Sequence, residues 1–163
     1  MENITLTPKP EPRKIGGLLI LVALGLLFSP LRLCMSLVVT FPPIIIDGTW
    51  ETLTTAGSEF HSPLWGPLLT AELVFNLGIL LISLYLAYLF FNKKMEFPEW
   101  YAGLALISFV FILVDAYLVT MILPEIPMFD FETISALIPT LGSLLIWSPY
   151  LFLSKRSKET FIL

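Results

Sequence analysis

The sequence predicts an all-α fold: a polytopic membrane protein with four transmembrane helices in an antiparallel bundle. Hydrophobic residues make up 56% of the 163 residues and charged residues only 13%. The mean hydropathy is +0.87, which is far too apolar for a soluble domain of this size. Four apolar segments, 15–39, 64–91, 101–123 and 134–153, each contain at least the roughly 20 residues that a helix needs to cross a hydrocarbon core.

The placement of charge predicts the orientation of these spans. Eight of the nine Lys and Arg residues precede the first span, follow the second or follow the fourth, so they fall on one side of the membrane. The other two connections, 40–63 and 124–133, carry acidic residues and no Lys or Arg. The positive-inside rule therefore predicts that both termini are cytoplasmic.

The chain divides into three parts. Residues 1–14 form a proline-rich cytoplasmic leader that is expected to be extended, and residues 15–153 form the transmembrane domain. Residues 154–163 form a basic cytoplasmic tail with Lys155, Arg156 and Lys158. These cations follow the last span directly, so they can mark its orientation or attract anionic lipid.

The first span is expected to bend at Pro30, because proline has no N–H to donate to the carbonyl one turn earlier. The long connection after it is expected to form a short helical turn that anchors Trp50 at the membrane interface. Trp65 lies where the second span begins and is expected to be a second anchor. His61, in the same connection, is expected to make a hydrogen bond within the loop.

The later elements are simpler. The tight turn 92–100 makes the second and third helices neighbours. Pro139 and Pro149 are expected to bend the fourth helix. Trp147 and Tyr150 lie near its end, where aromatic side chains favour the membrane interface.

Three ionisable residues, Arg32, Glu72 and Asp115, lie inside three different spans. A charge at mid-membrane costs roughly 2.5–3.5 kcal/mol on insertion scales, so we expect these side chains to face inward and neutralise one another. A rise of ~1.5 Å per residue from the predicted span ends places all three at one level in the outer half of the membrane. Small and polar residues at helical spacing favour the same inward orientation: Gly25, Ser29 and Ser36 on the first span, Asn76 and Ser83 on the second, Ser108 on the third, and Thr140 and Ser143 on the fourth.

This polar centre has two interpretations. In the first, a buried salt-bridge network fixes which helices pair. In the second, the centre binds a ligand or handles protons, because two acids that share one arginine need not both be ionised.

Several classes of function find no support in the sequence. The single cysteine, Cys34, excludes a disulfide or a thiolate metal cage within one chain, and the single histidine excludes a bis-histidine site. No phosphate-cradling glycine loop, HExxH motif or catalytic triad is recognisable, so we expect no enzyme, cofactor or metal. The basic tail is too small to indicate nucleic-acid binding.

Distinctive short motifs are spread along nearly the whole chain. The most specific is the ending Trp-x-Pro-Tyr-x-x-x-Ser-Lys-Arg, followed by Thr-Phe. The others are Ile15-Gly16-Gly17, Ser29-Pro30-Leu31-Arg32, Trp50, His61-Ser62-Pro63-Leu64-Trp65, Glu72, Phe90-Phe91-Asn92-Lys93, Phe97-Pro98 and Asp115. Together these motifs resemble a bacterial family catalogued as domain of unknown function 2569; Ser157 departs from the family pattern, because a hydrophobic residue is expected there. The resemblance implies a small four-helix protein of the bacterial inner membrane and brings no activity.

The leading hypothesis is a non-enzymatic inner-membrane protein that acts as an accessory or interaction subunit, with the lipid bilayer, other membrane proteins or a second copy as partners. The alternative is a transporter-like or small-ligand-binding protein. It would use Arg32 for an anionic group and Glu72 or Asp115 for protons.

Overall fold

The computed structural model describes residues 11–163, so most of the predicted leader lies outside the described part. Four stretches are long and apolar enough to cross a membrane: α1 (Leu19–Ile46), α3 (Trp65–Phe91), α4 (Phe97–Ile122), and the run Phe131–Leu153. That run consists of α5 (Phe131–Gly142), η1 (Ser143–Trp147) and α6 (Ser148–Leu153), and two short helices, α2 (Thr49–Thr54) and α7 (Lys155–Thr160), complete the fold. The chain is an all-helical, multi-pass membrane protein.

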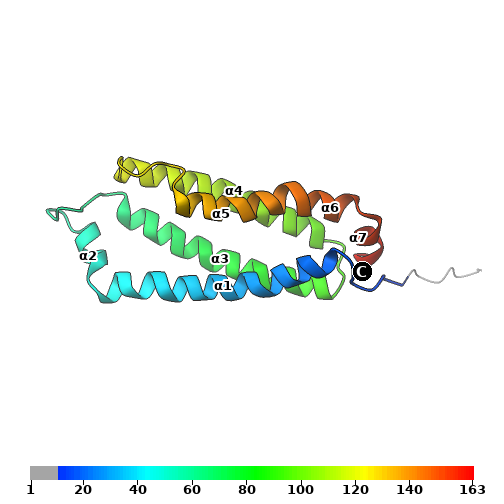
Figure 1. The fold of residues 1–163 in the computed structure, drawn as a ribbon. Coiled ribbons are helices and arrows are strands. Elements are labelled where there is room, and N and C mark those ends of the chain that lie inside the picture. The colour runs from blue at the N-terminus through cyan, green and yellow to red at the C-terminus, as the bar shows by residue number, and fades with distance from the viewer. Residues whose placement is uncertain (1–10) are drawn as a thin grey trace, which may run out of the picture.

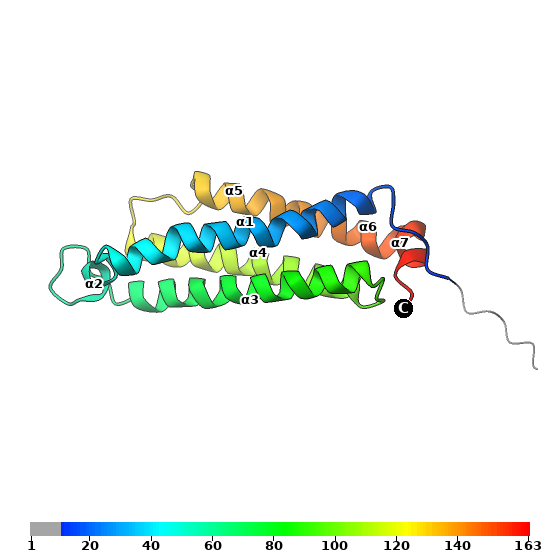
Figure 2. The same cartoon turned by 90° about the horizontal axis from the view of Figure 1, so that it is seen from below.

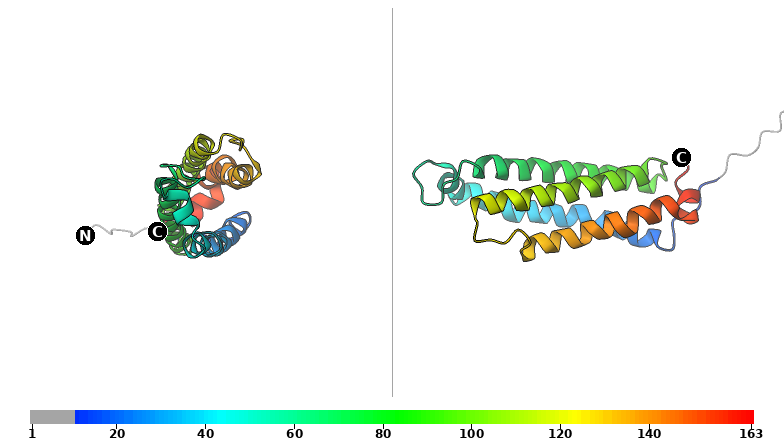
Figure 3. Two further views of the ribbon diagram at one scale, coloured as in Figure 1. Left: turned by 90° about the vertical axis from the view of Figure 1, so that its left-hand side faces the viewer. Right: turned by 90° about the horizontal axis from the view of Figure 1, so that it is seen from above.

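The long helices lie side by side as an open arc. α1 packs on α3, α3 packs on α4, and α4 packs on α5, η1 and α6. The view along the helices in Figure 3 shows α1 and α5 at the two ends of this arc. The α3–α4 turn, the start of α1 and α7 share one end of the molecule, called here the tail end; α2 and the α4–α5 connection share the other, the loop end (Figures 1 and 2).

Helix α1 differs from its predicted bounds at both ends. It begins at Leu19 rather than near residue 15, because Gly17 has a left-handed φ of 60° that turns the chain just before the helix. It ends at Ile46 rather than near residue 39, and it contains Pro42 and Pro43. Neither proline can donate to the turn before it, so the carbonyls of Val38 and Val39 lose their usual donors, and membrane-spanning helices tolerate this where other groups satisfy those carbonyls.

The fourth span contains a wider π turn at η1. The amide of Ser148 donates to the carbonyl of Ser143, and the Ser148 hydroxyl donates to the same oxygen at 2.8 Å. This turn lies immediately before Pro149, whose ring cannot donate to the preceding turn. The widened turn beside Pro149 is a change of helical pitch, and the bends predicted at Pro139 and Pro149 stay predictions.

The long loop contains the short helix predicted around Trp50. Helix α2 begins after Gly48, whose φ of 74° lets the chain reverse sharply after α1. The hydroxyl of Thr54 donates to the carbonyl of Trp50 at 2.7 Å, so this side chain adds a hydrogen bond to the last turn of the helix. α2 contacts both α1 and α3 and so covers the loop end between them.

The best-packed core lies at the tail end. Leu19, Phe90 and Phe97 are fully buried there, and Leu86 and Leu151 are nearly so. The cluster joins α1, both sides of the α3–α4 turn and α6. The spans therefore converge at this end and are less tightly packed toward the loop end.

The C-terminal tail folds against this core. The Phe161 ring packs against Phe90 and Phe97, with ring centroids 5.4 Å and 4.8 Å apart. Leu163 exchanges backbone hydrogen bonds with the α3–α4 turn, accepting from Met95 N and donating to Lys93 O. Residues 155–163 thus close the tail end of the molecule.

Candidate functional site

Two carboxyl groups meet between α3 and α4. Glu72 lies near the start of α3 and Asp115 near the end of α4, and their side chains face each other closely enough to interact by a hydrogen bond. Both are half-buried. Asp115 Oδ1 is enclosed and receives no hydrogen bond from a conventional donor. A single proton shared by the two carboxyl groups would give this oxygen a partner.

A stacked pair of aromatic rings, Phe75 and Phe111, lies beside the acid pair on the side toward the tail end. The rings of Phe75 and Phe111 are parallel within 7°, with centroids 3.6 Å apart. Phe75 follows Glu72 by three residues and Phe111 precedes Asp115 by four, so each ring is on the same helix face as its acid, one turn nearer the tail end. The stack separates the acids from the tail half of the molecule.

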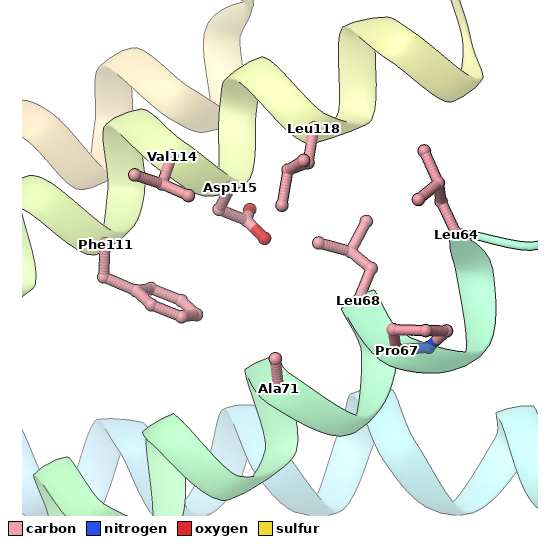
Figure 4. Close-up of a pocket in the computed structure, with 8 residues that line it drawn as sticks. All are labelled: Leu64, Pro67, Leu68, Ala71, Phe111, Val114, Asp115 and Leu118. Atoms are coloured by element: carbon pink, nitrogen blue, oxygen red, sulfur yellow. The ribbon is translucent and has the colours of Figure 1, made fainter.

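Toward the loop end, Asp115 opens into a small pocket. The pocket has a volume of about 240 Å³ and is lined by apolar side chains of α3 and α4 apart from this one acid. Figure 4 shows Asp115 from α4 pointing across the pocket toward Leu68 and Ala71 of α3. Asp115 is therefore the one acidic group that a ligand in this otherwise apolar pocket could contact.

A third acid lies near the pair. Glu132, in the first turn of α5, is close enough to Glu72 to repel it electrostatically. Asp130 begins this helix, and its carboxylate accepts a hydrogen bond from Thr133 N at 2.8 Å, which holds the pKa of Asp130 below its usual value. The half of the molecule nearer the loop end therefore includes the acidic side chains Glu72, Asp115, Asp130 and Glu132.

The expected neutralisation by Arg32 is absent. Arg32 is exposed, and no ion pair within residues 11–163 includes it. None of the three predicted charges is fully buried. The predicted closed centre of one cation and two acids is thus replaced by an acid pair between α3 and α4 and a separate cation on α1.

The shifted start of α1 explains part of this difference. Counted from Leu19, Arg32 lies ~20 Å along the helix, near its middle. Asp115 lies ~27 Å from Phe97, and Glu72 lies ~29 Å from Phe91, so the acids are more than a turn nearer the loop end. Rotation explains the rest, because Arg32 is ~200° around the helix from buried Pro30.

Arg32 belongs to an exposed row of small and polar residues, the α1 polar flank, defined here as Gly25, Ser29, Arg32 and Ser36. All four were predicted to face inward together. Their spacing does place them on one side of α1, but α3 packs against another side. Ser29 and Ser36 are therefore exposed rather than part of a buried centre.

The other predicted site residues have local partners. Asn76 donates to the carbonyl of Glu72 at 2.9 Å, so it supports the helix beside the acid pair. Trp50, His61 and Trp65 are half-buried at the loop end, and His61 Nδ1 is enclosed without a hydrogen-bond partner. The hydrogen bond expected of the His61 side chain is not found within residues 11–163; only the His61 backbone N–H donates, to Ser58 O at 3.2 Å.

The three cations of the basic tail differ in their exposure to solvent. Lys155 and Lys158 are exposed, whereas Arg156 is half-buried with its guanidinium group against Gly16 and Gly17. A Cβ on Gly16 would lie 2.5 Å from Arg156 Nη2, so this glycine makes room for the arginine. Ser157, the departure from the family motif, is buried at 1% exposure.

Sequence reasoning missed the Phe75–Phe111 stack, Glu132 and the Arg156 contact. The stack had a usable signal, because each ring is three or four residues from an intramembrane acid. Glu132 was assigned to a connection because the fourth span was expected to begin at residue 134. The Arg156 contact joins residues distant in the chain and had no local signal.

A family model described as "Protein of unknown function (DUF2569)" matches residues 12–162. The match therefore covers nearly all of the chain. No curated protein and no solved structure gives a significant match.

Proposed function

The chain belongs to the DUF2569 family, and we propose that it is a small non-enzymatic protein of the bacterial inner membrane that acts as an accessory subunit for another membrane protein. The observation that carries this proposal is Arg32. It is exposed near the middle of a candidate membrane span, with no ion-pair partner within residues 11–163.

A cation in this position is unfavourable in lipid. Insertion scales put an arginine at the centre of a span at roughly 2.5–3.5 kcal/mol, and intramembrane charges are usually covered by protein or water. On the open side of the arc, no helix within residues 11–163 lies between α1 and α5. A partner helix against α1 would remove the unfavourable exposure.

Photo-crosslinking in the native membrane tests the proposal. A photoreactive amino acid at Ser36, on the α1 polar flank, should form a discrete adduct with another protein. The matched control is Met35, one residue away and 63% exposed among apolar neighbours, where lipid adducts should dominate. Equal lipid-only labelling at both positions would contradict an accessory role through α1.

The antiparallel bundle is proposed to have both termini in the cytoplasm. The loop-end connections carry acidic residues and no Lys or Arg, whereas Lys93, Lys94 and the tail cations lie at the tail end. This distribution supports the orientation by the positive-inside rule. In a Cys34→Ala background, an impermeant maleimide added to intact spheroplasts should label Ser58→Cys and not Lys158→Cys; the reverse pattern would overturn the orientation.

The acid pair favours a second candidate function, proton handling coupled to a small ligand. Glu72 and Asp115 face each other between two spans. Two like charges this close in a low dielectric repel strongly, so sharing one proton between the carboxyl groups would relieve the repulsion. The apolar pocket beside Asp115 would accommodate the ligand. Arg32 is left out of this candidate, because it is exposed on α1 and makes no ion pair with either acid.

Infrared spectroscopy separates this candidate from a purely structural acid pair. At neutral pH, the protein in lipid should show a protonated-carboxyl stretch that disappears in Asp115→Asn or Glu72→Gln. A proton carrier should also dissipate a pH gradient in proteoliposomes, and Asp115→Asn should slow this without unfolding the protein. An unchanged gradient in both proteins would exclude proton handling and leave the accessory role.

A further inference from the structure

Helix α1 has three distinct sides. One packs on α3 through the buried residues Leu19, Val22, Leu26, Pro30 and Leu37. A second is exposed and wholly apolar, as expected of a lipid-facing surface: Ile20, Leu24, Leu27, Leu31, Met35 and Val38. The third is the α1 polar flank, which is equally exposed but differs in chemistry from the lipid-facing side.

We propose that the α1 polar flank binds a transmembrane helix of a different protein that carries a carboxylate near its middle. This rests on the proposed accessory function and adds the surface and the chemistry of the partner. The flank spans positions 25 to 36, so it offers about three helical turns, or ~17 Å, of contact.

The shape of the flank suits close helix packing. A Cβ added to Gly25 would meet nothing within 4 Å, so its surface is open to a second backbone. Ser29 and Ser36 follow at helical spacing and are exposed. Small residues at this spacing let transmembrane helices approach closely, and serine hydroxyl groups can donate across the contact.

The charge of the flank selects a carboxylate. Arg32 carries a permanent positive charge, and its planar guanidinium group matches a carboxylate with two parallel hydrogen bonds. The residue lies ~20 Å from both ends of α1. Arginine reaches the lipid headgroups from the terminal turns of a helix rather than from its middle, so a buried acid fits better than a lipid phosphate.

A second copy of this chain fits the flank poorly. A twofold contact of α1 with α1 would bring the two Arg32 guanidinium groups together, and like charges in a low dielectric repel strongly. Of the acids in the described spans of another copy, Glu72 and Asp115 are half-buried and face each other between α3 and α4. Glu99 and Glu132 are exposed, but they lie in the first turns of α4 and α5, away from the middle of a span. The carboxylate must therefore come from another protein.

Energy transfer in vesicles tests the inference with synthetic partner helices. The full-length protein, labelled at Lys158→Cys in a Cys34→Ser background, is reconstituted in uncharged phosphatidylcholine with labelled Leu/Ala helices. The helices carry a central Glu, a central Gln, only Leu, or a Glu displaced by seven residues, which shifts it ~10 Å along the axis. The measured quantity is the mole fraction of helix that gives half-maximal transfer.

The central-Glu helix should bind about tenfold more tightly than the all-Leu helix, from an intramembrane polar contact of 1–2 kcal/mol. The helices with a central Gln or a displaced Glu should bind with an affinity between those two. Arg32→Leu and Gly25→Leu should each weaken binding of the central-Glu helix, Arg32→Lys should retain part of it, and Met35→Leu should leave it unchanged.

Three results would overturn the inference: equal binding of the Glu and Leu helices, no effect of Arg32→Leu, or Arg32-dependent transfer between two labelled copies of the protein. The two proposals can fail separately. If the Ser36 adduct persists while the Glu helix fails to bind, the accessory role stands and the carboxylate partner does not. If the adduct is also absent, both are wrong.

Discussion

Phe75 of α3 and Phe111 of α4 stack face to face with ring centroids 3.6 Å apart, one helical turn from the carboxyl groups of Glu72 and Asp115. The stack fixes the rotation of two neighbouring spans and so keeps the two acids facing each other. Stacked aromatic pairs contribute about 1 kcal/mol beyond the area they bury. A double-mutant cycle with Phe75→Leu and Phe111→Leu should give a coupling free energy of about that size in SDS-driven unfolding. Additive effects of the two substitutions would show that the rings do not interact.

The packed tail predicts a large effect of Phe161. This ring is 6% exposed and touches two fully buried rings, so Phe161→Ala leaves a cavity outside the spans. The free energy of unfolding should fall by about 3 kcal/mol, as in other buried Phe-to-Ala changes. The matched control is Lys158→Ala, an exposed residue on the same short helix, which should change it little. Equal, small effects would mean that the tail is not docked in the membrane-bound protein.

Gly17 is required by the backbone before α1. Its φ of 60° disfavours any residue with a Cβ, and a Cβ there would also lie 3.2 Å from Arg156 Nη1. Gly17→Ala should therefore destabilise the protein by about 1 kcal/mol or more. Gly103→Ala is the control, because its Cβ would meet nothing within 4 Å and alanine favours a helix. Thermal unfolding in a mild detergent measures both, and a neutral Gly17→Ala would contradict the sharp turn.

Asp130 is expected to make the stability of the folded protein depend on pH. Because the hydrogen bond from Thr133 N lowers the pKa of Asp130 in the folded protein, the ionised carboxylate stabilises the start of α5. That stabilisation is fully present above the usual pKa of 3.8 and is lost as the pH falls through the lower folded value. Asp130→Ala should lose it at neutral pH, whereas Asp130→Asn should keep a neutral cap. The difference in melting temperature between wild type and Asp130→Ala should be constant from pH 7 to about pH 4 and shrink as the pH falls further below 3.8; a difference that does not shrink there would contradict the cap.

The spans could be predicted from the sequence because length and hydropathy alone decide whether a helix can cross a membrane. Helix ends were less certain: the left-handed turn at Gly17 and the continuation through Pro42 and Pro43 depend on tertiary contacts as well as local preference. The α1 shift moved Arg32 away from the level of the acids. An error of four residues along a helix is ~6 Å in depth, which is more than the rise of one turn.

The site was predictable in part. Glu72 and Asp115 could be brought together because both are isolated acids in adjoining spans. The sequence could not show that the arc stays open, because a polar row faces inward in a closed bundle and toward a partner in an open one. The orientation of Arg32 therefore depends on how the helices close, which local periodicity does not encode.

The free-energy coupling between Arg32 and the acid pair within one chain tests most directly whether Arg32 is available to another protein. Two double-mutant cycles, Arg32→Leu with Glu72→Leu and Arg32→Leu with Asp115→Leu, are measured by SDS-driven unfolding of the purified protein. We expect coupling below about 0.5 kcal/mol in both cycles, because Arg32 is exposed and makes no ion pair with either acid. Coupling above about 1 kcal/mol in either cycle would mean that the charges neutralise one another inside this chain, and would contradict a partner carboxylate at Arg32.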